Sequence, residues 1–468
     1  MTPPGAFFFV RAGYKIRSMR SWITGALLLL LLPVTSTAAE ISVQEALLRA
    51  KPAVSLVVAE VGSEVIVTCG GGGEKLIRPA PFRETGTGWF ISPSGWMITN
   101  AHLVSPASQT PAWVADQQAR RAVREACGEL SPQALAAAVA RAKVKLDPSI
   151  SVILSNGIRL PATVSKYSPP VAGESMSGRD LALLKLEAVD MPTLSLADSS
   201  NAQIGDKIHI LGFPGVVLSH ELLNASAKAE ASVTSGAISG FKQDLKNQPV
   251  IQIDAPAAWG NSGGPAVSSQ GEVLGVLTFV SVAGGTDEGV VQGFNFVIPS
   301  AAVREFLKGA GVPLEEPSRF NAAWHAGLRA YFSGDYSRAE KYFAEANRLV
   351  PELPDVRRIT AEAKNPPPKP FPWATVAAVV TALSLGAYAG MWGLRWRRNR
   401  YRIRPSEVVR LIEASKERPI ILDVRDAATY QKSPVRIPDS KHITPQELES
   451  GVTALKIEPT RTVVAYCT

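Results

Sequence analysis

The hydrophobic positions of this chain follow different rhythms in different stretches. Between residues 54 and 297, short apolar runs rich in valine, leucine and isoleucine recur at close spacing, separated by Gly, Pro and Asn. Such runs are typical of β-strands, and many of them in series indicate a barrel or a sandwich. We predict strands within 54–69 and over 88–91, 96–99, 151–154, 181–186, 207–213, 229–238, 250–253, 272–280 and 291–297.

Helical patterns appear in three places. Residues 41–50 favour a helix, and the alanine-rich, charged stretch 110–145 interrupts the strand pattern with sequence that favours helix formation. We predict that an insertion over 105–148 contributes two helices, acting as a packed surface insert or as a lid or docking element. In residues 321–351, small and aromatic side chains alternate at a spacing that lets two antiparallel helices approach closely.

One stretch is apolar on every side. Residues 372–394 carry no charge over 23 positions, with Trp373, Tyr388 and Trp392 near the ends. This exceeds the ~20 residues needed to cross a bilayer core, whereas a buried core helix rarely stays uncharged for so long. Residues 365–371 form a Pro-rich linker before it. Arginines cluster directly after it and place the following chain in the cytoplasm: Arg395, Arg397, Arg398, Arg400, Arg402 and Arg404.

The N-terminus has the composition of a secretory signal. Basic residues precede a leucine-rich run at 22–32, and small residues follow up to Ala39. We predict a signal peptide over 1–39, cleaved near Ala38 or Ala39. An uncleaved anchor and a start at Met19 are the alternatives. The segment between this signal and the apolar stretch would then lie outside the cytoplasm.

Composition narrows the function classes. A length of 468 residues suggests roughly three domains. The arginine cluster nearly accounts for the net charge of +8, so we expect no nucleic-acid partner. No zinc-ligand spacing or nucleotide-binding motif is present, and we expect no cofactor and no metal. Cys69 and Cys127 fall in the extracytoplasmic part and form either one disulfide or two free thiols.

A serine flanked by glycines stands in the segment 260–265, ahead of an apolar run. The N–H groups of Gly260 and Ser262 can there point at one carbonyl oxygen as it becomes negative. His102 follows one strand-like run and Asp180 begins another, which gives the order His, Asp, Ser of a catalytic triad. Asp254 is the rival carboxylate, and we interpret it as a support for the active-site loop. The other histidines, His209, His220, His325 and His442, are interpreted as structural.

These motifs resemble the HtrA/Deg branch of trypsin-like serine proteases. The resemblance is carried by residues 86–92, 99–104, 180–186, 260–265 and 293–300, and it covers roughly residues 45–310. It implies an all-β protease domain of two six-stranded barrels, in which Ser262 attacks a peptide carbonyl, His102 is the base and Asp180 orients the imidazole. HtrA proteins usually carry a PDZ domain after the protease, which this sequence lacks. Relatives often form trimers, so a homo-oligomer is an open expectation.

The resemblance also implies a pocket for the residue before the scissile bond. Its predicted lining contains no obvious acidic residue, so we expect an aliphatic preference rather than one for Lys or Arg. The lining residues are Leu277, Thr278, Phe279 and Asn295.

Two further modules resemble known families. Residues 320–363 resemble a single tetratricopeptide repeat, which is short of the ~3 repeats usually needed for independent stability. It must therefore pack on the protease, on the following helix or on another subunit, as a structural spacer rather than a peptide-binding unit. Residues 405–468 resemble the first part of an α/β rhodanese domain that is truncated after Cys467, either a fragment or a degenerate domain. We expect no sulfur transfer by it.

The sequence thus predicts a multidomain chain: a membrane-anchored periplasmic serine endopeptidase with a single transmembrane helix and a cytoplasmic tail. Its partners would be unfolded or membrane-proximal protein substrates. The alternative is a membrane-tethered scaffold or sensor with latent protease activity, whose repeat and rhodanese-like modules bind partners.

Overall fold

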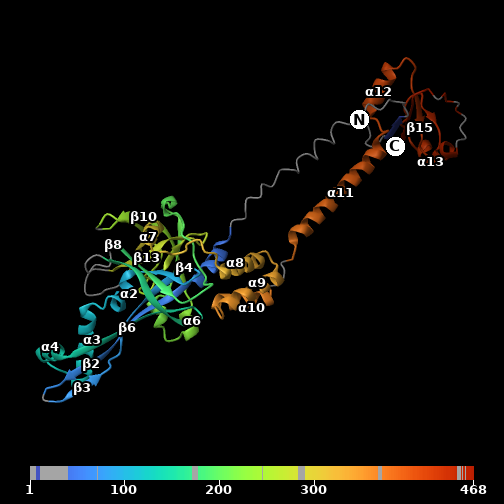
Figure 1. The fold of residues 1–468 in the computed structure, drawn as a ribbon. Coiled ribbons are helices and arrows are strands. Elements are labelled where there is room, and N and C mark those ends of the chain that lie inside the picture. Colours follow the sequence, from blue (N-terminus) through green and yellow to red (C-terminus); the bar gives the residue numbers. More distant parts are fainter. Residues whose placement is uncertain are drawn as a thin grey trace. The chain divides into compact units, whose positions relative to one another are not determined.

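The computed structural model describes residues 7–10, 41–70, 72–170, 178–244, 246–282, 290–366, 371–450, 455, 457–458 and 460–467. The chain divides into two compact units (Figure 1). One is Ser36–Pro368, and the other combines Met1–Thr35 with Lys369–Thr468. Most of the predicted signal peptide, including its cleavage site, lies outside the described residues.

The larger unit begins with the helix α1 (Val43–Ala50), which confirms the helix predicted at 41–50, and the short helix η1 (Lys51–Ala53). A ring of six strands follows. The ring is closed because its long first strand pairs with both its second strand and its last strand. The ring runs β2 (Val54–Thr68), β4 (Phe82–Ser92), β5 (Trp96–Thr99), β8 (Gly178–Leu186), β7 (Arg159–Pro170) and β6 (Lys143–Ile153).

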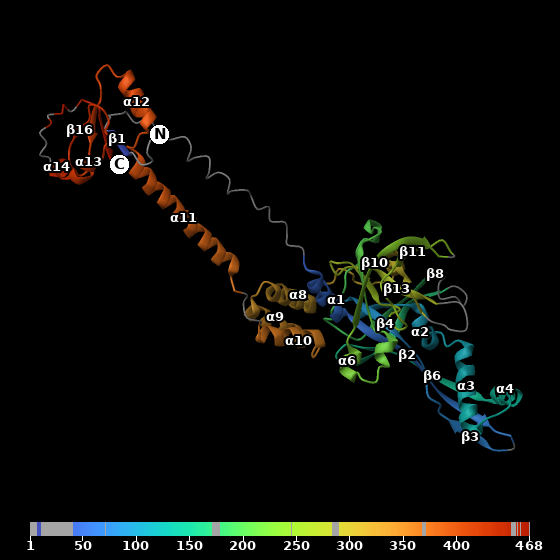
Figure 2. The same ribbon diagram turned by 180° about the vertical axis from the view of Figure 1, so that it is seen from behind.

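A second closed ring of six strands follows in the chain. Together the two rings confirm the double barrel expected from the sequence. The strands are β9 (Lys207–Gly212), β10 (Ser232–Gln243), β11 (Pro249–Ile253), β12 (Pro265–Val267), β13 (Val273–Val282) and β14 (Val290–Pro299). Figure 2 labels three of them, β10, β11 and β13. Four short helices occur in the same part of the chain: η2 (Ser199–Asn201), α5 (Gly215–Leu218), α6 (Ala225–Ala229) and α7 (Ser300–Leu307).

One hydrophobic cluster joins the two barrels. It contains Trp89 and Leu181 from the first barrel and Leu211, Phe213 and Val276 from the second, all fully or almost fully buried. Burial of such side chains stabilises a fold by about 1.5–3 kcal/mol each. The shared cluster therefore holds the two barrels together.

The outer half of β2 extends beyond the ring, where it pairs with β3 (Glu74–Ile77) and with the first residues of β6. Two helices, α3 (Ala112–Cys127) and α4 (Pro132–Arg141), cover it through a small apolar cluster. A disulfide between Cys69 and Cys127 closes this arm. Of the two alternatives left open by the sequence, a disulfide or two free thiols, the structure contains the disulfide.

The predicted insertion needs a correction at each end. Its two helices are present, but residues 143–148 belong to β6 and not to a helical segment. Residues 143–147 alternate Lys, Val, Lys, Leu and Asp, and side chains that alternate in this way suit a strand with one face covered. Residues 105–108 also belong to another element, the helix α2 (Ala101–Ser108).

Three helices complete the larger unit: α8 (Arg319–Phe332), α9 (Tyr336–Leu349) and α10 (Pro354–Lys364). Gly327 lies so close to the ring of Phe343 that an added Cβ would come within 2.4 Å of it. The indole N–H of Trp324 donates to the Leu48 carbonyl over 2.7 Å, and Lys51 pairs with Asp355 over 3.1 Å. The helical unit therefore packs on the segment of α1 and η1 at the start of the larger unit.

The smaller unit contains α11 (Trp373–Asn399), a helix of 27 residues with a mean hydropathy of 1.6 and no buried part. Among the described residues it alone is long and apolar enough, by length and composition, to cross a membrane.

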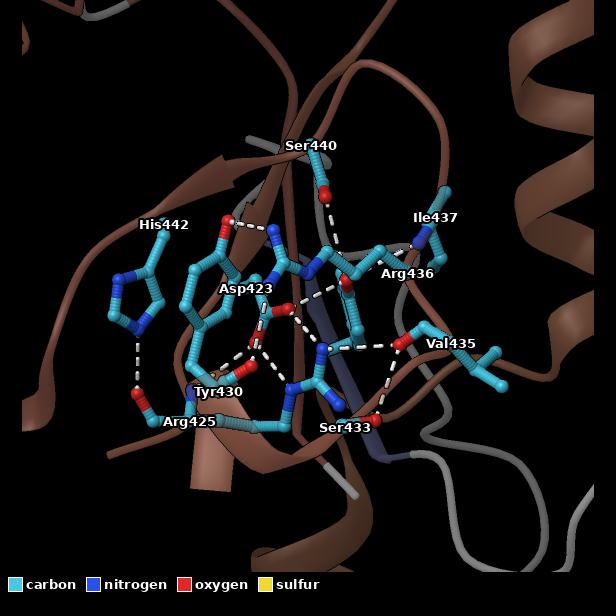
Figure 3. Close-up of polar contacts among 10 residues, drawn as sticks. Asp423, Arg425, Tyr430, Ser433, Val435, Arg436, Ile437, Ser440 and His442 are labelled. Carbon is cyan, nitrogen blue, oxygen red and sulfur yellow. Dashed lines mark hydrogen bonds and ion pairs between the residues drawn. The ribbon is translucent and has the colours of Figure 1, made fainter. Parts of the chain in front are cut away.

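The remainder of the smaller unit is a four-stranded sheet in the order β1–β17–β15–β16. The strand β15 (Ile420–Asp423) lies parallel to β16 (Lys441–His442) and to β17 (Val463–Cys467), while β1 (Phe7–Val10) is antiparallel to β17. The helices are α12 (Pro405–Ala414), α13 (Ala427–Lys432) and α14 (Pro445–Ser450). At the carboxyl ends of β15 and β16, Asp423, Arg425, Tyr430 and His442 form a polar cluster (Figure 3).

Candidate active site

The turn that carries Ser262 depends on glycine. Gly260 has φ +96° and Gly263 has φ +82°, values that residues with a Cβ rarely adopt. A Cβ on Gly263 would also lie 2.2 Å from the Thr87 carbonyl oxygen. The Ser262 carbonyl accepts a hydrogen bond from the Thr87 N–H over 2.8 Å, which fixes the turn of the second barrel against strand β4 of the first.

His102 lies in the first turn of α2, immediately after β5. Its backbone N–H donates to Asp180 Oδ1 over 2.9 Å, and its ring Nδ1 lies 2.7 Å from Asp180 Oδ2. Because a carboxylate can only accept, Nδ1 carries the hydrogen and Nε2 is left as the basic atom. Asp180 therefore fixes both the position and the tautomer of the imidazole.

Asp180 is held from several directions. It is 2% exposed and has φ +32°, an unusual value for a residue with a side chain. Its carboxylate accepts from the Thr278 hydroxyl over 2.7 Å, and its carbonyl accepts from Asn100 Nδ2 over 2.8 Å. Unusual backbone conformations persist where the surroundings determine them strongly, and they cluster at functional sites.

The charge of Asp180 changes the basicity of His102. Burial of the imidazole is the largest single effect and lowers its pKa, whereas the charge and the hydrogen bond of the Asp180 carboxylate raise it. The charge of Glu84 acts in the same direction. The net result is a pKa of His102 above the ordinary 6.5. A general base with a pKa near neutrality is well matched to proton transfer at physiological pH.

Two backbone N–H groups near Ser262 are not engaged. In the described structure the N–H groups of Gly260 and Ser262 have no acceptor, whereas the Gly260 carbonyl accepts from the Thr87 hydroxyl over 2.7 Å. The Thr87 hydroxyl in turn accepts from the Phe213 N–H over 3.1 Å. Thr87 thus orients the peptide between Gly260 and Asn261, which lies between the two peptides that carry the candidate oxyanion donors. The sequence motifs did not reveal this contact.

Ser262 and His102 are brought to the same junction. A Cβ on Gly263, the residue after the serine, would lie 3.0 Å from the backbone nitrogen of Asn100. Asn100 precedes the helix that carries His102 by one residue. Within the described residues, no hydrogen bond joins the Ser262 hydroxyl to the imidazole. Such bonds are often long without substrate and tighten in the reacting complex.

The residues predicted to line the substrate pocket occupy different environments. Leu277 is buried in the core of the second barrel, and the Thr278 hydroxyl donates to Asp180. Asn295 Nδ2 donates to the Ala255 carbonyl over 2.7 Å. The side chain of Phe279 lies outside the described part of the structure. The role of Thr278 as a partner of Asp180 was not foreseen, since the sequence places the two 98 positions apart.

The rival carboxylate has a separate role. Asp254 Oδ1 accepts from the Ala237 N–H over 2.6 Å and so supports the pairing of β10 with β11. Among the other histidines, His209 shares a hydrogen bond with Ser235 and His325 has its pKa lowered to about 4 by burial and by Arg49 and Arg329. Over the described residues, no group of three or more His, Cys, Asp or Glu side chains is arranged to hold a metal ion.

Residues 86–276 match the family model described as the Trypsin-like peptidase domain. The chain is 28% identical over 248 residues to a "Probable periplasmic serine endoprotease DegP-like" of Pseudomonas fulva, covering 52% of this chain and 38% of that protein. It is 28% identical over 227 residues to "Serine protease HTRA4" of Homo sapiens, covering 48% and 34%. The match thus spans little more than a third of the length of these relatives.

Solved structures give a weaker likeness. An "HtrA-type protease AlgW with decapeptide" is 21% identical, with a TM-score of 0.36 over 58% of this chain and 69% of that one. The serine endoprotease from Yersinia pestis is 22% identical, with a TM-score of 0.34 over 58% and 66%. The sequence comparisons support a serine endopeptidase with an HtrA/DegP-like, trypsin-fold protease domain.

Proposed function

We propose that this chain is a membrane-anchored serine endopeptidase that hydrolyses peptide bonds through Ser262, His102 and Asp180. The observation that carries the proposal is the pairing of His102 Nδ1 with the buried Asp180 carboxylate, on an element that contacts the turn of Ser262. The family match includes all three residues.

The reaction follows from the roles of these groups. Ser262 Oγ attacks the peptide carbonyl carbon while His102 Nε2 accepts the hydroxyl proton. The imidazolium is stabilised by Asp180 and then donates that proton to the leaving amine. The N–H groups of Gly260 and Ser262 stabilise the oxyanion, and loss of one such donor typically costs about 10²–10³ in rate. Water then attacks the acyl carbon while His102 accepts its proton. His102 returns a proton to Ser262 Oγ as the acyl group leaves.

The proposed location is the inner membrane, with the protease domain in the periplasm and the tail in the cytoplasm. The apolar helix α11 and the arginines at its end support one membrane crossing in this direction. The disulfide between Cys69 and Cys127 suits an oxidising compartment. The name of the Pseudomonas fulva relative also places that protein in the periplasm.

Substrates would be unfolded or membrane-proximal proteins, cut after aliphatic residues. In this proposal the protease domain spans 45–310 and the repeat-like unit 320–363 packs beside it. The rhodanese-like domain 405–468 lies on the opposite side of the membrane, in the cytoplasm. The proposal includes assembly of the chain into a homo-oligomer. Profiling of cut sites in an unfolded protein measures the preference, and a dominance of Lys and Arg before the cut would contradict it.

A fluorophosphonate probe tests the enzyme and its topology together. In intact cells with a permeabilised outer membrane, the probe should label the full chain at Ser262, and the Ser262→Ala variant should show no labelling. That variant should lose about 10⁶-fold in kcat while its thermal unfolding is unchanged. If peptide hydrolysis in Ser262→Ala is undiminished, the assignment fails.

The second candidate is a tethered scaffold whose protease is latent. The observation that favours it is the missing hydrogen bond between Ser262 and His102 in the described residues. Labelling of the isolated full chain would favour the enzyme. Labelling only after a partner or peptide is added would favour the latent form.

A further inference from the structure

Glu84 is an acidic residue beside the candidate active site that the mechanism does not use. It lies in β4, and within the described residues its side chain makes no hydrogen bond or salt bridge. Its neighbour Arg83, by contrast, pairs with Glu60 over 2.7 Å on the other face of the strand. The interaction that Glu84 does make is electrostatic, with His102.

The strand pairing shows which way Glu84 faces. The ladder between β2 and β4 is regular from Val54 to Val61, so side chains two apart on β4 share a face. Phe82, on one side of Glu84, packs its ring 5.2 Å from that of Trp113 at the start of α3. On the other side, a Cβ on Gly86 would lie 2.2 Å from the Leu103 side chain on α2.

Glu84 therefore lies between two positions that both contact the segment of α2 and α3. Its cross-strand neighbour Ala59 is buried against Ala107 at the end of α2, which gives the same orientation. The first turn of α2 carries His102. The Glu84 carboxylate thus acts on the imidazole from β4, whereas Asp180 approaches it from another strand, β8.

The chemistry of acyl transfer shows which part of the substrate passes Glu84. The substrate carbonyl oxygen must point to the N–H groups of Gly260 and Ser262, and the leaving nitrogen must lie next to His102, which protonates it. Residues that follow the scissile bond consequently pass His102. A carboxylate beside the imidazole meets this part of the substrate. Because no Lys or Arg pairs with it among the described residues, a cationic side chain of the substrate would pair with it.

We propose that Glu84 is a specificity-determining residue that binds a Lys or Arg side chain in the first positions after the scissile bond. The inference rests on the proposed function. Burial raises the pKa of Glu84, and the charge of His102 opposes this only in part. The preference for a cation should accordingly disappear as acidification neutralises the carboxyl.

The test uses the full chain in detergent and fluorogenic peptides that differ only in the two positions after the scissile bond. The wild type should cleave Arg peptides about 5- to 20-fold better, in kcat/KM, than Gln peptides, as a partly buried charged pair allows. Glu84→Gln should abolish this ratio, and Glu84→Arg should invert it in favour of Glu peptides. Glu60→Gln is the matched control, since it removes one acid from the same ladder on the opposite face, and it should keep the ratio.

The outcomes separate the two proposals. A wild type without charge preference, or a preference that survives in Glu84→Gln, overturns the role of Glu84 alone. An equal loss of activity on Arg and Gln peptides in Glu84→Gln also overturns it, because the residue would then act only through His102. Absence of Ser262-dependent turnover on every peptide overturns the proposed function itself.

Discussion

Asp180 in the protease part and Asp423 in the C-terminal part are carboxylates buried to nearly the same degree, at 2% and 0% exposure. Their partners differ. Asp423 accepts from Arg425 Nε over 2.8 Å and from Nη2 over 2.5 Å, and from the Tyr466 hydroxyl over 2.7 Å (Figure 3). Arg425 is itself buried and permanently charged. The pair lies at the end of β15, and the Tyr466 hydroxyl connects it to β17.

The partner of Asp180 is a titratable imidazole that remains partly exposed, with 26% of its side chain accessible. One ring nitrogen is fixed by the carboxylate and the other stays free to exchange a proton. Burial of a carboxylate is therefore not a sign of catalysis in itself. The nature and exposure of the cation opposite it decide whether the group does chemistry or holds structure.

The largest expected effect comes from removing the charge of Asp180. In Asp180→Asn, His102 would lose the acceptor that fixes its tautomer, and kcat should fall by about 10⁴, as in the triad of chymotrypsin-like enzymes. Steady-state hydrolysis of a peptide measures this. Asp254→Asn is the control, because an amide oxygen can still accept from Ala237, and its activity should stay within about two- to threefold of the wild type.

The same substitution at Asp423 should affect stability instead. Asp423→Asn leaves Arg425 buried without its anion, which typically costs about 3–5 kcal/mol. Hydrogen exchange of the full chain should show faster exchange in β15 and β17, with peptide hydrolysis unchanged. The exposed Asp439→Asn should alter neither. If Asp423→Asn abolished hydrolysis while β15 stayed protected, the contrast between the two carboxylates would be wrong.

A smaller effect is expected from Thr278, which donates to Asp180. Thr278→Val keeps the shape of the side chain but removes a hydrogen bond to a charged group, worth about 1.5–3 kcal/mol. The value of kcat/KM should fall by about 10- to 100-fold, and Thr278→Ser should restore most of it. The predicted place of Thr278 in the substrate pocket gives a different result. Thr278→Val would then change KM more than kcat, and the change in KM would depend on the residue before the scissile bond.

The smallest effect concerns pH. Since the Asp180 carboxylate raises the pKa of His102, the acidic limb of kcat/KM should have its midpoint above 6.5. The free energy of unfolding should change with pH in the opposite direction to the activity. Because the pKa of His102 is raised in the folded state, its protonation stabilises the fold below the ordinary pKa, and this stability is lost as the pH rises through the folded pKa. A pH–rate profile with its acidic midpoint below 6.5 would contradict the raised pKa.

Much of the fold could be predicted from the sequence. The strands with Gly and Pro punctuation, the helices at 41–50 and in the insertion, and the close approach at Gly327 all depend on residues near one another in the chain. The strand β7 and the extension of β6 to Lys143 were missed, because Pro and charged residues weaken the alternating pattern there. The candidate nucleophile was evident from its glycines.

The sequence by itself determined the local conformations: the turn around Ser262, the helix start before His102 and the apolar length of α11. Only the tertiary structure decided that Thr87 orients the Gly260 carbonyl, 173 positions away, and that Thr278 donates to Asp180, 98 positions away. A turn or a helix start is fixed by the steric limits and hydrogen bonds of a few adjacent residues. Contacts between distant strands form only when both barrels close and bury the cluster between them, and no short pattern of residue types encodes that closure.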